Sequence, residues 1–291
     1  MVLFYRDKSF CEFFYIIMKK SHIRKEYADN IYHDTQNKRC FLRTSVINCP
    51  QTDRKEVATM IQIDLITGFL GSGKTTFIRR YAKYLIDQGL NIGILENDFG
   101  AVNVDALLLQ DILGDNCTLE MVAGGCDADC HRRRFKTKLI AMGMCGYDRV
   151  LVEPSGIFDM DEFFDALHEE PLDRWYAIGN VITIIDAALD QELSKDSRYI
   201  LASQTAQAGT VLYSHVQEVS PAQLEETRQF VTGIMNELHM TLPAGQTVFQ
   251  KDWTDLTTQD FRQIMSSGYH GADYAKLWMD SQKTYDSLYF M

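Results

Sequence analysis

Short apolar runs alternate with amphipathic segments along most of this chain. Near-continuous apolar, β-branched stretches occupy positions 61–67, 91–97, 147–154, 180–187 and 209–216. Each is followed by a segment with helical spacing, and the clearest of these, 220–238, opens with Ser220 as a cap and Pro221 in the first turn. Apolar strands that alternate with helices form a parallel sheet covered on both faces. The pattern therefore predicts an α/β fold with a mostly parallel sheet between two layers of helices.

The connection after the first of these runs is rich in glycine. Its sequence, GFLGSGKTT, fits the pattern G-x-x-x-x-G-K-[ST], with a predicted strand before it and a predicted helix after it. Glycines let the backbone turn tightly and point N–H groups at phosphate oxygens, and the helix N-terminus adds its positive dipole. The stretch predicts a P-loop NTPase fold. The expected phosphate-binding residues are Gly68, Gly71, Ser72, Gly73, Lys74, Thr75 and Thr76.

Three of the residues around this loop have predicted roles in catalysis or Mg²⁺ binding. Lys74 is expected to reach the β- and γ-phosphates from a solvent-facing position, and the Thr75 hydroxyl is expected to ligate Mg²⁺. Glu153 ends the run 147–154, where P-loop proteins place an acidic residue near Mg²⁺ or its waters. A carboxylate that only caps the next helix is the alternative interpretation of Glu153.

Residues after two of the strands complete the predicted phosphate site. Asp98 follows the run 91–97 and is the candidate for orienting the attacking water, with Asp105 as the alternative from the next loop. Gly156 is expected to let the backbone approach the γ-phosphate, as switch glycines do. Lys74, Asp98 and Glu153 are therefore the predicted catalytic residues.

Composition and charge narrow the classes of partner. The formal net charge of −11 argues against nucleic acid. The longest early apolar run, 13–18, is far shorter than the roughly 20 residues of a membrane span, so no membrane is expected. Seven irregularly spaced cysteines beside a P-loop indicate reduced thiols and a cytoplasmic protein.

The first 59 residues differ in charge and pattern from the remainder. They hold 11 Lys and Arg against 7 Asp and Glu, net +4, while the rest of the chain is net −15. Their sequence is polar and weakly patterned, and Met60 directly precedes the first predicted strand. We expect 1–59 to be a poorly ordered extension and 60–270 to be the nucleotide-binding domain.

Five motifs in order resemble the CobW-type GTPases, relatives of the nickel metallochaperones UreG and HypB. They are GFLGSGKTT, ENDFGAVNVDALLL, GGC, LVEPSGIFD and VITIIDA, and the resemblance covers about 60–250. It implies a P-loop protein that couples GTP binding and hydrolysis, with Mg²⁺, to the handling of a transition metal. Such proteins commonly carry a second, C-terminal domain. Positions 271–291 resemble only the start of that domain. Two interpretations stay open, a truncated chain and a reduced member of the family.

The metal motif of this family is G-C-x-C-C, and the sequence departs from it. Cys126 matches the first cysteine, whereas Ala128 and Asp129 stand where the other two belong, and Cys130 and His131 follow. Two thiolates and an imidazole suit Zn²⁺ or a similar metal. The alternative is that Cys126 packs in the sheet and Cys130 only begins a helix.

The stretch expected to recognise the base also departs from the family pattern. Where the family reads guanine with Asn-Lys-x-Asp, this chain has Ser214, His215 and Gln217. An amide in place of the carboxylate loses charge-assisted hydrogen bonds, so the site is expected to read guanine weakly or to accept ATP.

Two classes of function remain open. The first is a Mg²⁺-dependent GTPase that gates metal transfer, with a metalloprotein client and a homodimer as conceivable partners. The second is a nucleotide-binding carrier or regulatory switch with little hydrolysis. A small-molecule kinase shares the P-loop, but no acceptor site or lid is visible in the sequence.

Overall fold

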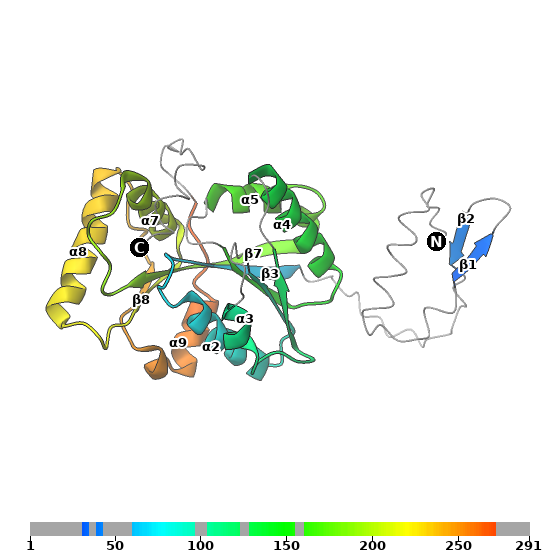
Figure 1. Ribbon diagram of the computed structural model, residues 1–291, viewed down its shortest axis with the longest axis horizontal. Helices are drawn as coiled ribbons and strands as arrows, with labels where there is room; N and C mark the ends of the chain where they lie inside the picture. The colour runs from blue at the N-terminus through cyan, green and yellow to red at the C-terminus, as the bar shows by residue number, and fades with distance from the viewer. Residues whose placement is uncertain are drawn as a thin grey trace. The chain divides into compact units, whose positions relative to one another are not determined.

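The computed structural model divides the chain into two units, Met1–Val57 and Ala58–Met291 (Figure 1). The residues that the structure describes are 31–34, 39–42, 60–96, 104–122, 128–154 and 160–271. In the first unit, β1 (Ile31–Asp34) and β2 (Arg39–Leu42) pair antiparallel, with Ile31 opposite Leu42. The predicted extension 1–59 and the predicted stub 271–291 lie almost wholly outside the described residues, so both stay predictions.

The second unit is built on a seven-stranded sheet whose order is β5-β4-β6-β3-β7-β8-β9. Every strand pair in it is parallel, as the continuous apolar runs predicted. All strands therefore end at the same edge, where ligands of open α/β sheets bind. The strands are β3 (Ile61–Thr67), β4 (Ile92–Glu96), β5 (Cys117–Met121), β6 (Arg149–Glu153), β7 (Tyr176–Asp186), β8 (Thr210–Ser214) and β9 (Thr247–Phe249).

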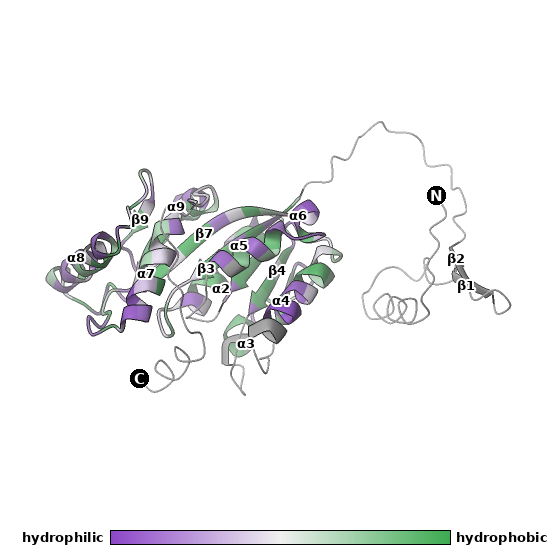
Figure 2. Cartoon of the chain, turned by 90° about the horizontal axis from the view of Figure 1, so that it is seen from above, coloured by the Kyte–Doolittle hydropathy of each residue, from purple (hydrophilic) through white to green (hydrophobic). Residues whose placement is uncertain are grey.

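Helices cover both faces of this sheet, which confirms the predicted layering (Figure 1). One face packs against α2 (Lys74–Asp87), α3 (Val104–Leu109) and α9 (Thr258–Met265). The other face is covered by α4 (Ala128–Gly143), α5 (Met160–His168), α6 (Leu172–Trp175), α7 (Lys195–Gln207) and α8 (Pro221–Glu237). The central strands bury apolar side chains on both faces, and the outer faces of the helices carry hydrophilic residues (Figure 2). Among the described residues, no helix is both long and apolar enough to span a membrane.

The helix caps follow the sequence closely. The Ser220 hydroxyl caps α8 by accepting a hydrogen bond from the Gln223 backbone N–H, and the Gln223 side-chain oxygen accepts one from the Ser220 backbone N–H, so the pair forms a capping box. Pro221 occupies the first turn, where its missing N–H costs nothing.

The two edge strands were not predicted from the apolar pattern. β5 is exposed or half-buried over most of its length, and β9 has only three residues. Edge strands have one open side and are commonly short, so their sequences carry a weaker apolar signal. The strand predicted at 180–187 also begins earlier, at Tyr176, and its register with β3 shifts between Ile63 and Leu65.

A buried polar network fixes the strand that leads into the glycine loop. Asp64 of β3 is fully buried and accepts from Arg149 Nη1 at 2.6 and 2.7 Å, from the Tyr81 hydroxyl at 2.9 Å and from the Asn180 backbone N–H at 2.9 Å. Burial raises the pKa of Tyr81 well above its ordinary value, so this hydroxyl stays protonated and donates. The network joins β3 to β6, β7 and α2, and removing one partner of such a buried pair typically costs about 3–5 kcal/mol.

Candidate nucleotide site

The glycine loop, 68–73, connects β3 to α2 at the ligand-binding edge of the sheet. Gly68, Gly71 and Gly73 all have positive φ, at 141°, 79° and 87°. A side chain at Gly68 would bring its Cβ to 2.3 Å from the Ile184 carbonyl oxygen, so the position requires glycine for space as well as conformation. Gly73 caps α2 without a side-chain hydrogen bond, and the first backbone N–H groups of the helix face the loop.

The predicted Lys74–Thr75–Glu153 set is brought together by the first turn of α2 and the end of β6. The Thr75 hydroxyl lies 3.1 and 3.0 Å from the two carboxylate oxygens of Glu153 and donates to that carboxylate. Lys74 Nζ donates to the Phe69 carbonyl oxygen at 3.1 Å and lies 3.8 Å from Glu153 Oε1. The acid, the cation and the hydroxyl thus form one cluster beneath the loop.

The prediction that Lys74 faces solvent was wrong. The residue is only 6% exposed, because it begins α2 and the helix presses its side chain between the loop and the end of β6. Its ammonium group therefore lies in a site of lower dielectric than water, where its attraction to an anion is stronger.

The residues present fit a triphosphate and Mg²⁺. Ser72 Oγ is buried and has no hydrogen-bond partner among the described residues, whereas buried hydroxyls normally have one. Thr75 and Glu153 offer the oxygen donors that Mg²⁺ prefers. Thr76, the last of the predicted phosphate-binding residues, is exposed at the surface of α2.

Several predicted residues around the phosphates lie outside the described residues. These are Asp98 and Gly156, together with the side chain of Asp105, whose backbone belongs to α3. Glu96, two positions before Asp98, ends β4 and pairs directly with Glu153 of β6. Both carboxylates are buried at the carboxyl ends of their strands, and Glu153 is the one that contacts Lys74 and Thr75.

The predicted metal motif also lies beyond what the structure describes. Cys126 falls in the gap 123–127, and α4 begins directly after it, so the backbones of Cys130 and His131 are helical while their side chains are not described. Within the described residues, no group of three or more His, Cys, Asp and Glu side chains is placed to hold a metal ion. The transition-metal ligands therefore stay a prediction.

The predicted base-reading residues lie at the end of β8 and directly after it, and β8 is two strands away from β3, the strand that leads into the glycine loop. Ser214 is buried and its Oγ donates to the Ile185 carbonyl oxygen at 3.4 Å. His215 is half-buried, adopts a left-handed backbone with φ of 51°, and its Nδ1 lies 3.0 Å from Asp186 Oδ2. Gln217 is exposed in the following turn.

Trp253 is a further residue at this site, and sequence reasoning missed it. It opens a short 3-10 helix, η2 (Trp253–Asp255), after the unpredicted strand β9. A Cβ added to Gly73 would lie 3.3 Å from Trp253 Nε1, so the indole borders the last glycine of the loop. No local motif around Trp253 indicates this contact, which depends on the order of strands in the sheet.

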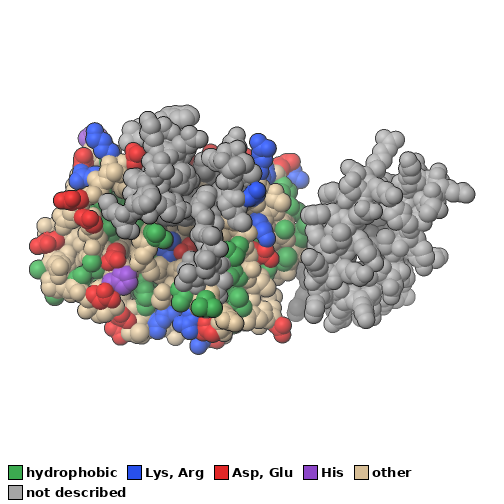
Figure 3. Space-filling model, in the orientation of Figure 1, with side chains coloured by type: hydrophobic (Ala, Val, Ile, Leu, Met, Phe, Trp, Pro, Cys, Tyr) green, Lys and Arg blue, Asp and Glu red, His purple; other side chains and the backbone are tan. Residues whose placement is uncertain are grey.

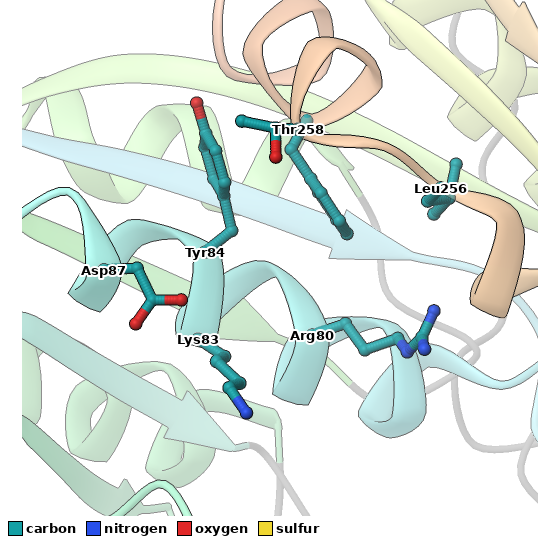
Figure 4. Close-up of a pocket in the computed structure, with 7 residues that line it drawn as sticks. Arg80, Lys83, Tyr84, Asp87, Leu256 and Thr258 are labelled. Carbon is teal, nitrogen blue, oxygen red and sulfur yellow. The ribbon is translucent and has the colours of Figure 1, made fainter.

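A shallow pocket of about 240 Å³ lies farther along α2 (Figure 4). Its lining residues are Arg80, Lys83, Tyr84, Asp87, Leu256, Thr258 and Phe261. Because Arg80 is six residues beyond Lys74, the pocket begins about 9 Å along the helix from the phosphate cluster. This lining carries two basic side chains, Arg80 and Lys83, and one acidic side chain, Asp87. Acidic and basic side chains are also interspersed over the part of this unit that is visible in Figure 3.

Comparison with known proteins places the fold and the glycine loop in a family. The CobW/HypB/UreG nucleotide-binding domain matches residues 62–241. The chain therefore belongs to this family of P-loop proteins, which confirms the predicted resemblance.

Individual relatives give the extent of the similarity. The chain is 29% identical over 161 residues to the zinc chaperone YjiA of Escherichia coli K12, which covers 52% of this chain and 48% of that protein. It is also 29% identical over 163 residues to the zinc chaperone YeiR of the same organism, covering 56% and 48%. The chain thus spans about half the length of these curated relatives. Among solved structures, HypB from Helicobacter pylori in complex with nickel aligns with a TM-score of 0.46 at 15% identity, over 70% of this chain and 84% of that one.

Proposed function

We propose that this protein is a Mg²⁺-dependent GTP-binding protein that hydrolyses GTP and couples the reaction to the handling of a transition metal. The observation that carries the nucleotide part is the contact between the Thr75 hydroxyl and the Glu153 carboxylate beneath a glycine-rich loop. Membership of the CobW/HypB/UreG family supports the same assignment.

Each residue of the cluster has a distinct proposed role. The loop N–H groups and Ser72 hold phosphate oxygens, and Lys74 places its charge against the outer phosphates, where negative charge is greatest. Thr75 and Glu153 would hold Mg²⁺, which supplies positive charge to the phosphates when bound. Asp98 is the candidate for orienting the water that attacks the γ-phosphate, releasing GDP and inorganic phosphate.

We propose zinc as the metal cargo. The E. coli relatives are named zinc chaperones, and Cys126, Cys130 and His131 offer sulfur and nitrogen donors that suit Zn²⁺. A metalloprotein that receives the metal is the corresponding client, and nucleotide-dependent rearrangement of the segment 99–125 would connect the phosphate site to Cys126. On this proposal the protein acts in a reducing cytoplasm, where thiols stay available as ligands.

A second candidate function is a slow nucleotide-binding carrier or switch. It is favoured by one observation, which is that Ser214, His215 and Gln217 replace the residues that read guanine in the family. Such a protein would bind GTP and ATP comparably and turn over little of either.

Turnover without any acceptor molecule separates these functions. Release of phosphate from GTP should require Mg²⁺, and Thr75→Ala should lower it by about tenfold or more, since a hydrogen bond to a charged group contributes about 1.5–3 kcal/mol. Thr232→Ala, which removes an exposed hydroxyl from α8, is the matched control and should leave the rate unchanged. Tight nucleotide binding with no phosphate release would favour the carrier.

The metal proposal needs its own measurement. Zn²⁺ titration against a competing chelator should show one tight site, and Cys126→Ser should weaken it. Cys145→Ser is the matched control, because Cys145 is an exposed free thiol at the end of the α4 region. Equal Zn²⁺ affinity in Cys126→Ser and the unmodified protein would contradict the proposed ligand.

A further inference from the structure

Beyond β3, the strand that leads into the glycine loop, the sheet continues with three more strands. β7, β8 and β9 follow β3 in the sheet order, and all of them are parallel, so Asp186, Ser214 and Phe249 end their strands on the side of the loop. Asp186 and Ser214 are directly paired in register. With phosphates held above β3 and the start of α2, the rest of a nucleotide can extend over the residues that follow β8 and β9.

An indole ring lies at the point where these residues meet the loop. A Cβ added to Gly73 would lie 3.3 Å from Trp253 Nε1 and 3.9 Å from Ser214 Cβ. The ring centroid of Trp253 lies 5.6 Å from that of Phe77, which fixes the indole against the first turns of α2. Trp253 is only half-buried, so part of its surface remains exposed.

His215 directly follows Ser214, and its imidazole is held by Asp186. Its Nδ1 lies 3.0 Å from Asp186 Oδ2, and Asp186 Oδ1 accepts from the Ala188 backbone N–H at 2.8 Å. A non-glycine residue at φ of 51° is uncommon, so the surrounding structure holds this turn in place. The carboxylate therefore orients the ring, as such partners commonly orient histidines in binding sites.

We propose that Trp253 is the platform on which the nucleobase stacks, and that the Asp186–His215 pair forms the polar wall beside it. This inference rests on the proposed nucleotide-binding function. An aromatic platform attracts any base through its π face, whereas a carboxylate placed for guanine rejects other bases. The structure thus predicts a site that prefers purine nucleotides, with their larger rings, over pyrimidine nucleotides but separates GTP from ATP poorly.

Binding measurements with and without a base test the proposal directly. Trp253→Ala should weaken Mg·GTP and Mg·ATP by about 5-fold to 100-fold, the range measured for loss of one base–aromatic stack. Trp253→Phe should recover much of that loss, because it keeps an aromatic face. Mg·tripolyphosphate, which has no base, should bind all three proteins within about twofold, since it uses only phosphate contacts. Equal losses for GTP and tripolyphosphate in Trp253→Ala would overturn the proposal.

Failure of the underlying function gives a different result. If the loop does not hold phosphates, Mg·tripolyphosphate will not bind the unmodified protein, or Lys74→Ala will bind it as well as the unmodified protein does. If the loop binds phosphates but Trp253 has no role, the Trp253 variants will bind Mg·GTP as tightly as the unmodified protein does, whereas Lys74→Ala will bind it more weakly.

Fluorescence keeps the proposal falsifiable even if Trp253→Ala unfolds. The chain has three tryptophans, so the double variant Trp175→Phe, Trp278→Phe leaves Trp253 as the only one. Mg·GTP should quench or shift its emission, and Mg·tripolyphosphate should change it far less. Trp175 is a suitable residue to replace because it ends α6 just before β7 begins, at the end of the strands that lies away from the glycine loop. An emission that does not respond to a bound nucleotide would rule out stacking.

Discussion

The phosphate side and the base side of this site are built in different ways. The phosphate side comes from one continuous stretch, 68–76, and from Glu153 on the adjacent strand β6. The proposed base side combines Asp186, which ends β7, with His215 and Trp253, which come after β8 and β9. The first depends mainly on backbone conformation and the second on side chains from distant parts of the chain.

This difference explains why one side keeps the family pattern and the other departs from it. A glycine at 68 cannot be replaced without a collision with the Ile184 carbonyl, so the loop has few alternatives. The residues after β8 and β9 contribute through their side chains, and different side chains can serve there. Nucleotide binding and base selectivity can therefore change independently, and the following variants test that separation.

The largest effect is expected from Lys74→Ala. Loss of two or more charge-assisted contacts, each contributing about 1.5–3 kcal/mol, should weaken Mg·GTP and Mg·ATP alike by at least about a hundredfold. Isothermal titration measures both affinities. Lys83→Ala, exposed on the same helix, should leave both unchanged. Lys74 is buried, and its Nζ lies 3.8 Å from Glu153 Oε1. Thermal unfolding of the variant should therefore be measured as well, to show that the fold is kept.

Two glycines of the loop should differ in their tolerance of a side chain. Gly68→Ala combines a strained backbone with a backbone collision, each costing about 1–3 kcal/mol. Gly71→Ala has a positive φ but nothing within 4 Å of the added Cβ, so it should cost only about 1–2 kcal/mol. Urea unfolding of both proteins compares the two costs. Equal destabilisation would mean that conformation alone, and not the contact with Ile184, requires the glycine.

The base side should gain selectivity when the family residues are restored. The triple variant Ser214→Asn, His215→Lys, Gln217→Asp should favour GTP over ATP by about 10-fold to 100-fold, because a charged acceptor for guanine is worth about 1.5–3 kcal/mol. Competition between the two nucleotides measures the ratio. Affinity for ATP should change far less than affinity for GTP, since the phosphate loop and Trp253 are untouched. Strong preference for GTP in the unmodified protein would show that other residues read the base.

The smallest effect is expected from removing 1–59. A protein beginning at Met60 keeps the whole seven-stranded sheet and should bind Mg·GTP within about twofold of the full chain, because no residue of the site lies in the removed part. Circular dichroism and titration compare the two. An insoluble or unfolded Met60 protein would indicate that the extension packs on the domain.

Much of the fold and the phosphate side could be predicted from sequence because the information is local. Apolar runs of strand length determined β3, β4, β6 and β8, and the spacing of glycines, Lys74 and Thr75 determined the loop that follows β3. Both patterns reflect local requirements. A strand buried on both faces needs a continuous apolar run, and a tight loop with positive φ needs glycine.

The tertiary structure decided what depends on residues far apart in the sequence. It placed β5 and β9 at the edges, where partial exposure weakens the apolar pattern, and it buried Lys74, which sequence alone placed in solvent. It also brought Trp253 to Gly73, a contact that requires β9 to follow β8 and β7 across the sheet. Strand order is set by packing of the whole sheet and not by any one segment, and for that reason Trp253 and the partner of His215, Asp186, became visible only in the folded chain.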